Sequence, residues 1–388
     1  MNHFYRLYRT LKFNMLIVLL LLLLTGKSTM AQTTGYTSVT ISTASTSNGS
    51  WSPAFAVGAG PYYFTPSGAI ATANVNVTEI VTRMGGLNAN LSYCNNVIIT
   101  TTNASGTGTG DISVNTPMNI PNYILDSSTP LYLDLTLQAN RNITISTSSA
   151  IDFTAAQPAR SLPGRPANSL TLIAGSTVNT GSVSILSSIT LKGGVPGTST
   201  PGSGGNGGNG GILTISTGSQ GSVSVGANLI CDGNNQQGTL GTTGGVGGQI
   251  SITGNNGITI TQNISTNGGG ASSTTYTNGN GGSIIINDGA ITVTIGGSTN
   301  DGQTAGIISA IAGTGGTAGI GGYLTKSGNG IFLLSQPNTY SGGTILNAGQ
   351  LNINHATAIG SGTFTINGGV IDNTTSGSIT LSNNNAQN

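Results

Sequence analysis

Charge is scarce in this 388-residue sequence, since Asp, Glu, Lys and Arg together make up only 5% of it. Four of its ten basic residues (Arg6, Arg9, Lys12 and Lys27) lie in the first 31 positions. The remainder carries six basic and nine acidic side chains, and no basic patch is interleaved with aromatic residues. Because nucleic-acid binding relies on such a patch, we expect no nucleic-acid partner. Ser, Thr, Asn and Gly must supply the solubility instead.

Groups suited to catalysis or metal binding are equally scarce. After position 31 the chain has one Glu, one His (His355) and eight Asp, none of them in an Asp-Asp or Asn-x-Asp pair. Glycoside chemistry needs clustered carboxylates, so a carbohydrate-active enzyme is the weakest of the alternatives. Asp232 and Asp288 follow expected strands, where an Asx-turn is the ordinary explanation. We predict a non-catalytic protein with no cofactor and no metal.

Cysteine occurs only at Cys94 and Cys231. In the repeat register derived below, the two residues lie three to four coils apart. At about 4.8 Å per coil that separation is roughly 14–19 Å, and a disulfide allows only about 7 Å between Cα atoms. We therefore predict two separate thiols, with Cys231 in an inward-facing column.

The sequence contains one long apolar run, MLIVLLLLLL at Met15–Leu24. It follows a cationic stretch and precedes small residues that end at Ala31, which is the pattern of a secretory signal peptide. A membrane anchor is the alternative, but ten apolar residues are half of the ~20 needed to span a bilayer. We predict that residues 1–31 are removed and that the mature chain does not span a membrane.

Glycine, by contrast, is abundant, with 63 residues, and it introduces a repeating motif. The motif reads GGILTI at Gly210, GGQISI at Gly247 and GGSIII at Gly281, with NSLTLI at Asn168 and YLDLTL before them. The first inward apolar residues of the copies lie 35, 43, 37 and 34 residues apart; they are Leu135, Leu170, Leu213, Ile250 and Ile284. Spacing in this range is typical of stacked repeats.

Each repeat unit contains three short segments that alternate apolar and polar residues, the pattern of strands with one buried face. Helical periodicity is absent outside residues 1–31. A strand-strand-strand-excursion cycle favours an all-β fold, a parallel β-helix, over a meander or a sandwich. We expect a β-rich N-terminal cap at 32–90, with Trp51 and the aromatic cluster at 61–64. The β-helix should occupy 91–322, and the region 323–388 should continue it.

Three stretches carry a family resemblance. NVIITTTNASGTGTGDISVN (96–115) and LTLQANRNITISTSSAIDF (135–153) resemble repeats of filamentous-haemagglutinin-like secreted adhesins. Residues 328–372, with the landmarks NTYSGGT, NAG, AIGSG and NGG, resemble the autotransporter-associated (passenger-associated) β-strand repeat. The resemblance implies a right-handed parallel β-helix at a bacterial surface, associated with the outer membrane, that commonly serves in adhesion. It also implies export through outer-membrane machinery.

The membrane barrel that ends an autotransporter is not recognisable after Gly369. We expect either a fragment of a larger product, with a barrel or sorting domain elsewhere, or a different secretion route. Our first functional hypothesis is a secreted or surface-exposed adhesin or scaffold. The second is a structural or export segment of a larger surface protein whose binding is carried elsewhere.

The long glycine-rich excursions are the best candidates for binding, because they should stack along one edge of the β-helix. The polar residues that distinguish them are Arg160, Arg165, Gln236, Gln237 and Tyr276. Solvated loops without a ligand are the simpler explanation. The sharper hypothesis is a polar ledge that engages glycans or the surface of a host or neighbouring cell.

Overall fold

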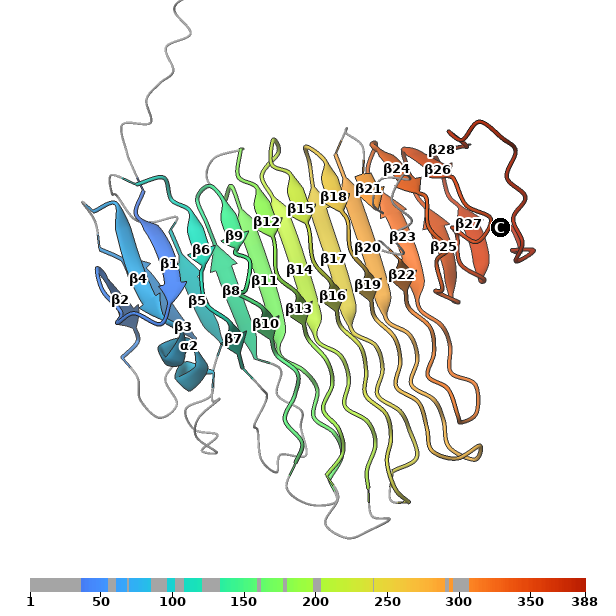
Figure 1. The fold of residues 1–388 in the computed structure, drawn as a ribbon, viewed down its shortest axis with the longest axis horizontal. Coiled ribbons are helices and arrows are strands. Elements are labelled where there is room, and N and C mark those ends of the chain that lie inside the picture. The colour runs from blue at the N-terminus through green and yellow to red at the C-terminus, as the bar shows by residue number, and fades with distance from the viewer. Residues whose placement is uncertain are drawn as a thin grey trace, which may run out of the picture. The chain divides into compact units, whose positions relative to one another are not determined.

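In the part of the chain that the structure describes, a computed structural model, the strands stack into three sheets, two of eleven strands and one of six (Figure 1). The structure describes residues 36–54, 61–67, 70–84, 96–101, 108–120, 133–158, 162–176, 180–197, 204–239, 241–289, 293–295 and 307–388. The predicted signal peptide, Cys94 and Arg160 lie outside these ranges. Tyr36–Asn388 forms one compact unit, which contains all the strands.

Each full coil contributes one strand to each sheet. Sheet 1 contains β5 (Val97–Thr100), β8 (Asp134–Gln138), β11 (Ser169–Ala174), β14 (Ile212–Thr217), β17 (Gln249–Gly254), β20 (Ser283–Asp288), β23 (Tyr323–Ser327), β25 (Gly343–Leu346) and β27 (Thr363–Ile366). Sheet 2 contains β6 (Ile112–Val114), β9 (Ile143–Ile145), β12 (Val183–Ile185), β15 (Val223–Val225), β18 (Ile258–Ile260), β21 (Val293–Ile295), β24 (Ile331–Leu334), β26 (Gln350–Ile353) and β28 (Val370–Asp372). Sheet 3 contains β7 (Met118–Asn119), β10 (Ile151–Asp152), β13 (Ile189–Thr190), β16 (Leu229–Ile230), β19 (Ile264–Ser265) and β22 (Ile308–Ser309).

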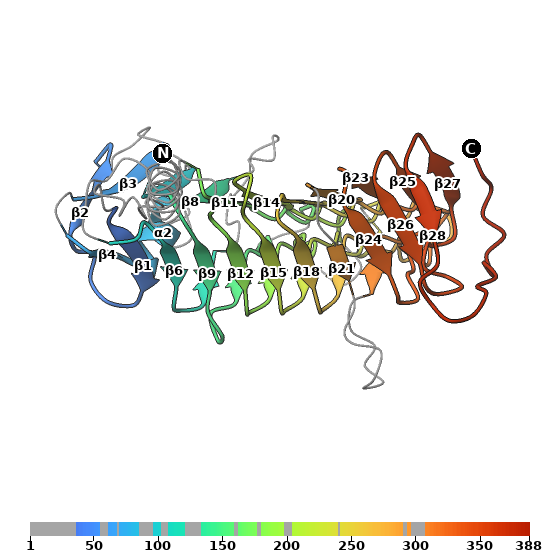
Figure 2. The same cartoon turned by 90° about the horizontal axis from the view of Figure 1, so that it is seen from above.

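The pairing register confirms the predicted parallel β-helix. Leu135 pairs with Leu170, Leu170 with Leu213, Leu213 with Ile250, and Ile250 with Ile284, all in parallel. In sheet 2, β6, β9, β12, β15, β18 and β21 follow one another in chain order (Figure 2). Every strand of a coil therefore pairs with the same strand of the next coil. The right hand of the helix stays a prediction.

The core consists of inward columns of Ile, Leu and Val. In the coil of β14 to β16, the inward residues are fully buried or nearly so; they are Leu213, Ile215, Val223, Val225, Leu229 and Cys231. Burying one such side chain contributes about 1.5–3 kcal/mol. Ordering a coil of some 35 residues costs about 1–2 kcal/mol per residue, so a coil is stable only with neighbours on either side.

Strands near the N-terminus extend the same sheets. β1 (Ser38–Ser42) lies between β4 (Thr72–Asn76) and β6 in sheet 2, and β3 (Tyr62–Pro66) pairs with β5 in sheet 1. The sheet-1 edge is then covered by β2 (Gly49–Ser52), which is antiparallel to β3.

One helix interrupts this region, so the prediction that no segment outside residues 1–31 is helical was wrong there. β4 ends at Asn76, and α2 follows at Val77–Arg83. The Asn76 side chain accepts a hydrogen bond from Thr78 N, which caps the helix. Glu79 in the first turn forms an ion pair with Arg83 in the last (3.1 Å). Arg83 lies over the Trp51 ring at 4.1 Å, which fixes the helix at this end of the stack.

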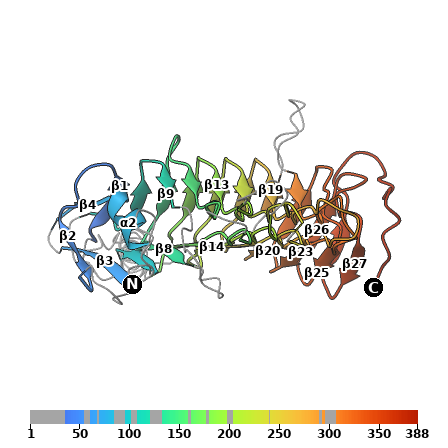
Figure 3. The same cartoon turned by 90° about the horizontal axis from the view of Figure 1, so that it is seen from below.

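The last coils are much shorter than the others. Leu324, Thr344 and Phe364 are successive register partners, so these coils span 20 residues each. β25 and β27 follow β23 at the C-terminal end of sheet 1 (Figure 3). Sheet 3 ends at β22, so the described coils after it have strands in sheets 1 and 2 alone.

Candidate functional site

Glycine-rich excursions leave each full coil after sheet 3 and return before sheet 1, below the strands in Figure 1. The described excursions stack on one another through backbone hydrogen bonds, as predicted from the repeat. Gly210 N donates to Val246 O, Gly247 N to Asn280 O, and Gly281 N to Ile320 O, each at 2.9 Å. The returning segments of four successive coils are therefore in parallel register.

Each returning segment also bonds to the outgoing segment beside it. Gly248 N donates to Cys231 O and Gly282 N to Thr266 O, both at 2.6 Å. The two layers approach so closely that side chains do not fit between them. A Cβ on Gly210 would overlap the carbonyl oxygen of Cys231, and one on Gly247 would overlap that of Thr266. Glycine pairs are thus required where the excursions before β14, β17, β20 and β23 return to sheet 1.

Because these glycines carry no side chains, they form the floor of an open groove of about 440 Å³ across four coils. We call it the glycine groove. It is lined by Asn209, Gly210, Ile212, Val246, Gly247, Gly248, Gln249, Gly281, Gly282, Ser283 and Tyr323. One wall is formed by the first residues of β14, β17, β20 and β23. The other contains Asn209 and Val246, just before the glycine pairs.

The walls of the groove expose apolar side chains. Ile212 and Tyr323 are each 44% exposed and Val246 is 41% exposed. Ile320 occupies the position in the next coil that corresponds to Val246 and Asn280, and it is 73% exposed. Solvent-exposed apolar side chains gathered beside a concavity are typical of a binding surface.

The polar side chains of the groove are uncharged amides and hydroxyls. Gln249 Nε2 donates to Ser283 Oγ (3.1 Å), and Asn209 Oδ1 accepts from Val246 N (2.9 Å). This bond links neighbouring coils through the side-chain oxygen of Asn209. The side chain is exposed, so its N–H₂ group can donate to a ligand. No lining residue carries a charge. The groove is therefore suited to a neutral ligand with both apolar faces and hydroxyl groups.

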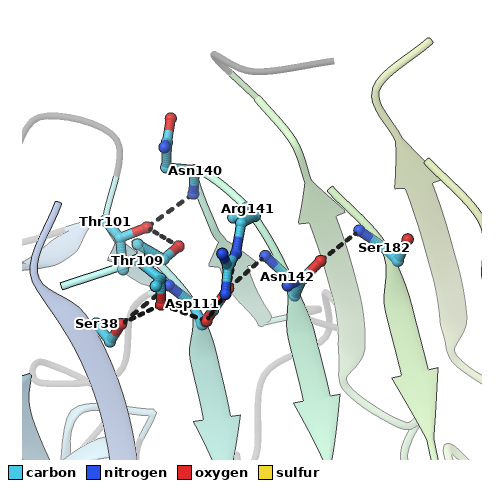
Figure 4. Close-up of polar contacts among 9 residues, drawn as sticks. Ser38, Thr101, Thr109, Asp111, Asn140, Arg141, Asn142 and Ser182 are labelled. Carbon is cyan, nitrogen blue, oxygen red and sulfur yellow. Dashed lines mark hydrogen bonds and ion pairs between the residues drawn. The ribbon is translucent and has the colours of Figure 1, made fainter. Parts of the chain in front are cut away.

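A separate polar cluster holds the first coils together (Figure 4). Arg141 Nε and Nη2 donate to the two carboxylate oxygens of Asp111 at 3.0 and 2.9 Å. Asn142 N (3.0 Å) and Thr109 Oγ1 also donate to Asp111. Burial by itself would raise the pKa of Asp111, but these donors and the Arg141 charge hold it below its ordinary value. Asp111 is thus charged and a poor general base. Its ion pair with Arg141 links the coils of β6 and β9, and we call this contact the Asp111 clamp.

The four predicted binding residues that the structure describes lie on three excursions, and two of the four are buried. Arg165 is buried near the base of its excursion, and its carbonyl accepts from Gly194 N. Gln236 is also buried: its Nε2 donates to Gly238 O and Gly241 O, and its Oε1 accepts from Ser272 N. Gln237 is exposed and Tyr276 is half-buried in the next excursion. A binding role stays a prediction for these residues and for Arg160.

Sequence analysis missed the glycine groove, although its signal was present. The residue after each of these glycine pairs is the first of its strand, and in two copies it is an exposed Ile212 or Tyr323. An apolar residue at an outward strand position could have marked the wall. The depth of the groove depends on the paired layers, which the repeat pattern does not reveal.

The Asx-turns expected at Asp232 and Asp288 were also wrong. Asp232 Oδ1 accepts from Asn267 N of the next coil (2.7 Å), so it bridges coils. Asp288 forms an ion pair with Lys326 (2.7 Å), and both side chains have zero exposure. A charged pair thus occupies positions that the alternation assigns to the core.

Two other side chains considered in the sequence, Cys231 and His355, lie in the described part of the chain. Cys231 is buried and unpaired, and burial raises the pKa of its thiol well above the ordinary value, so it is unreactive. His355 lies in a turn and contacts Thr357. Within the described ranges, no group of three His, Cys, Asp or Glu side chains could hold a metal, and no helix is long and apolar enough to cross a membrane.

Comparison with known families finds a match at residues 324–353, to the passenger-associated-transport repeat. This stretch comprises β23 to β26, the first short coils, and overlaps the predicted autotransporter-associated repeat. Searches of curated proteins and of solved structures find no match. The resemblance to filamentous-haemagglutinin-like adhesins stays a prediction. Residues 324–353 therefore carry a repeat that associates this β-helix with the exported passenger type of surface protein.

Proposed function

We propose that this chain is a non-catalytic adhesin, exposed at a bacterial surface, whose glycine groove binds neutral glycans of a host or neighbouring cell. The observation that carries the proposal is the gathering of exposed Ile212, Val246 and Tyr323 around a glycine floor with no charged lining residue. The transport repeat supports export to the surface through outer-membrane machinery.

The chemistry of the groove favours a sugar chain over a peptide strand. Backbone groups along the glycine floor are already used in bonds between coils and between layers, so a peptide could not extend a sheet there. Sugar rings present apolar faces and a rim of hydroxyls. The Tyr323 ring and the aliphatic side chains suit the faces, and the amides of Asn209 and Gln249 suit the hydroxyls.

The test compares two tyrosines with similar exposure. Tyr323 lies in the groove and is 44% exposed; Tyr63 lies on β3 and is 42% exposed. The full chain would be titrated with a panel of neutral linear oligosaccharides. We expect Tyr323→Ser to weaken binding by about tenfold, or roughly 1.4 kcal/mol, and Tyr63→Ser to leave it unchanged.

Equal affinity in the Tyr323→Ser variant and the unmodified protein would reject the groove as the site. In that case, loss of binding in Gln237→Ala or Tyr276→Ala would assign it to the excursion tips. These single substitutions are cleaner than deleting residues 234–246, because such a deletion would remove glycines on which the two layers depend.

A structural or export segment is the second candidate, and the transport-repeat match favours it. It predicts that the full chain binds neither the oligosaccharides of the panel nor intact cells. Passenger export would then fail when residues 324–353 are removed, whereas Tyr323→Ser would be exported normally.

A further inference from the structure

Lys326 and Asp288 occupy two core positions that hold apolar or small residues in neighbouring coils. Lys326 on β23 is the register partner of Ile286 on one side and Leu346 on the other. Asp288 ends β20 and is the register partner of Gly254. Both side chains are completely buried, and Lys326 Nζ lies 2.7 Å from Asp288 Oδ1. An amine and a carboxyl group are thus held in contact, across adjacent coils, without access to water.

The surroundings of the pair are simple. Lys326 Nζ donates to the carbonyl oxygens of Ser327 (3.0 Å), Gly328 (2.8 Å) and Ala348 (3.3 Å). With Asp288 Oδ1, four oxygens surround Lys326 Nζ, but a lysine ammonium has only three N–H donors. Within the described residues, no side chain other than Lys326 bonds to the Asp288 carboxylate. The two groups therefore form an isolated reacting pair.

Burial favours the neutral form of the Asp288 carboxyl group. Desolvation raises the pKa of Asp288, and the Lys326 charge offsets that rise only in part. Moving one proton from the ammonium to the carboxylate across the 2.7 Å contact yields a free amine beside a neutral carboxylic acid. Those are the two forms that can react with each other.

We propose that Lys326 and Asp288 condense, after folding, into an amide that covalently joins the coil of β20 to the coil of β23. The Lys326 nitrogen attacks Cγ of Asp288, a C–N bond forms, and a C–O bond of the carboxyl group breaks. The departing oxygen takes two hydrogens from the former ammonium and leaves as one water molecule. No oxidant, metal or external leaving group is needed.

The fold supplies what the uncatalysed reaction lacks in solution. Holding two groups in reactive contact corresponds to effective concentrations of about 10⁵–10⁸ M. Exclusion of water removes the solvent that would hydrolyse the product and competes for both charges. The link also lies where the matched transport repeat begins, at 324–353, so it would fasten the short coils to the long ones.

Mass spectrometry of the secreted full chain tests this directly. We expect an intact mass lower by one water than that of the mature sequence. Trypsin cleaves after Lys and Arg, and no Lys or Arg other than Lys326 lies between residues 193 and 388. An amide on Lys326 blocks cleavage there, so the denatured, digested protein should yield one fragment covering 193–388, also lower by one water.

A pair that remains ionic would give the unmodified mass and separate fragments 193–326 and 327–388, and that result would overturn the proposal. Lys326→Arg is the control, because a guanidinium keeps the charge but does not condense; it should show the full mass. If this variant does not fold, the measurement on the unmodified chain still decides. The test is independent of glycan binding, so the two proposals can fail separately.

Discussion

The coils between Leu135 and Gly322 are closed by backbone atoms, whereas those between Tyr323 and Asp372 are closed by side chains. In the long coils, glycine pairs let outgoing and returning segments bond directly, as between Gly248 N and Cys231 O. In the short coils, Asn338 Oδ1 accepts from Ile308 N (2.9 Å) and its Nδ2 donates to Ala358 O (2.6 Å).

Tyr340 completes the short closure. It is fully buried; its hydroxyl bonds to Thr344 Oγ1 (2.7 Å), and Thr344 in turn donates to Ile359 O (3.0 Å). The difference teaches that a coil can lose its third strand and its excursion if buried polar side chains supply the corner hydrogen bonds. Closing the long coils through glycine backbone atoms leaves an open groove over the glycine pairs. Closing the short coils through side chains needs no glycine pairs and therefore no such groove.

The largest effect should come from the junction between the two regions. Asp288→Ala would leave the buried Lys326 amine without its acid, which costs about 3–5 kcal/mol of unfolding free energy. Chemical denaturation followed by circular dichroism would measure this loss. The paired variant Lys326→Met with Asp288→Ala, which removes both groups, should regain most of it. Equal instability of the single and paired variants would contradict this account.

Backbone closure can be broken by adding one carbon. Gly247→Ala should destabilise the long coils by about 1–3 kcal/mol, because its Cβ would overlap the carbonyl oxygen of Thr266 in the outgoing segment. Hydrogen exchange should show the loss in the excursions around 245–282 first. Gly377→Ala is the control, since nothing lies within 4 Å of its Cβ. Similar exchange in both variants would mean that the layers are not closely packed.

Side-chain closure can be weakened by removing one oxygen. Tyr340→Phe should cost about 1 kcal/mol, since it removes the bonds to Thr344 and to Ala358 O (3.3 Å). Thermal unfolding should show the change, with faster exchange confined to residues after 330. Faster exchange in the excursions instead would mean that the two regions unfold as one.

The smallest effect concerns the Asp111 clamp in the long-coil region. Because the folded pKa of Asp111 is lowered, its contribution is present above the unfolded pKa of about 3.9 and is lost as pH falls through the folded value. Asp111→Asn should therefore flatten part of the acid limb of stability below about pH 4. The cost at pH 7 should be under about 1 kcal/mol, because the Arg141 pair is partly exposed. An unchanged acid limb would exclude the clamp.

Alternation by itself predicted the fold accurately in the long coils. The columns that begin at Leu135 and continue through Leu213 to Ile284 follow from period-two burial, a local property of a strand with one buried face. The helix at Val77–Arg83 escaped prediction because it has only seven residues and directly follows the alternating residues of β4. Asn76 as a cap, the helical spacing of Val77, Ile80 and Val81, and the Glu79–Arg83 pair distinguish it.

Sequence alone thus determined the strands, their inward faces, the coil spacing and the transport repeat, because each depends on neighbouring residues and on repetition. Tertiary structure alone decided which distant groups meet. The glycine groove exists because two layers of excursions pack within van der Waals contact, and Asp288 meets Lys326 because stacking aligns residues of adjacent coils. A burial pattern specifies which way a side chain faces, whereas its partner is set by how the coils stack.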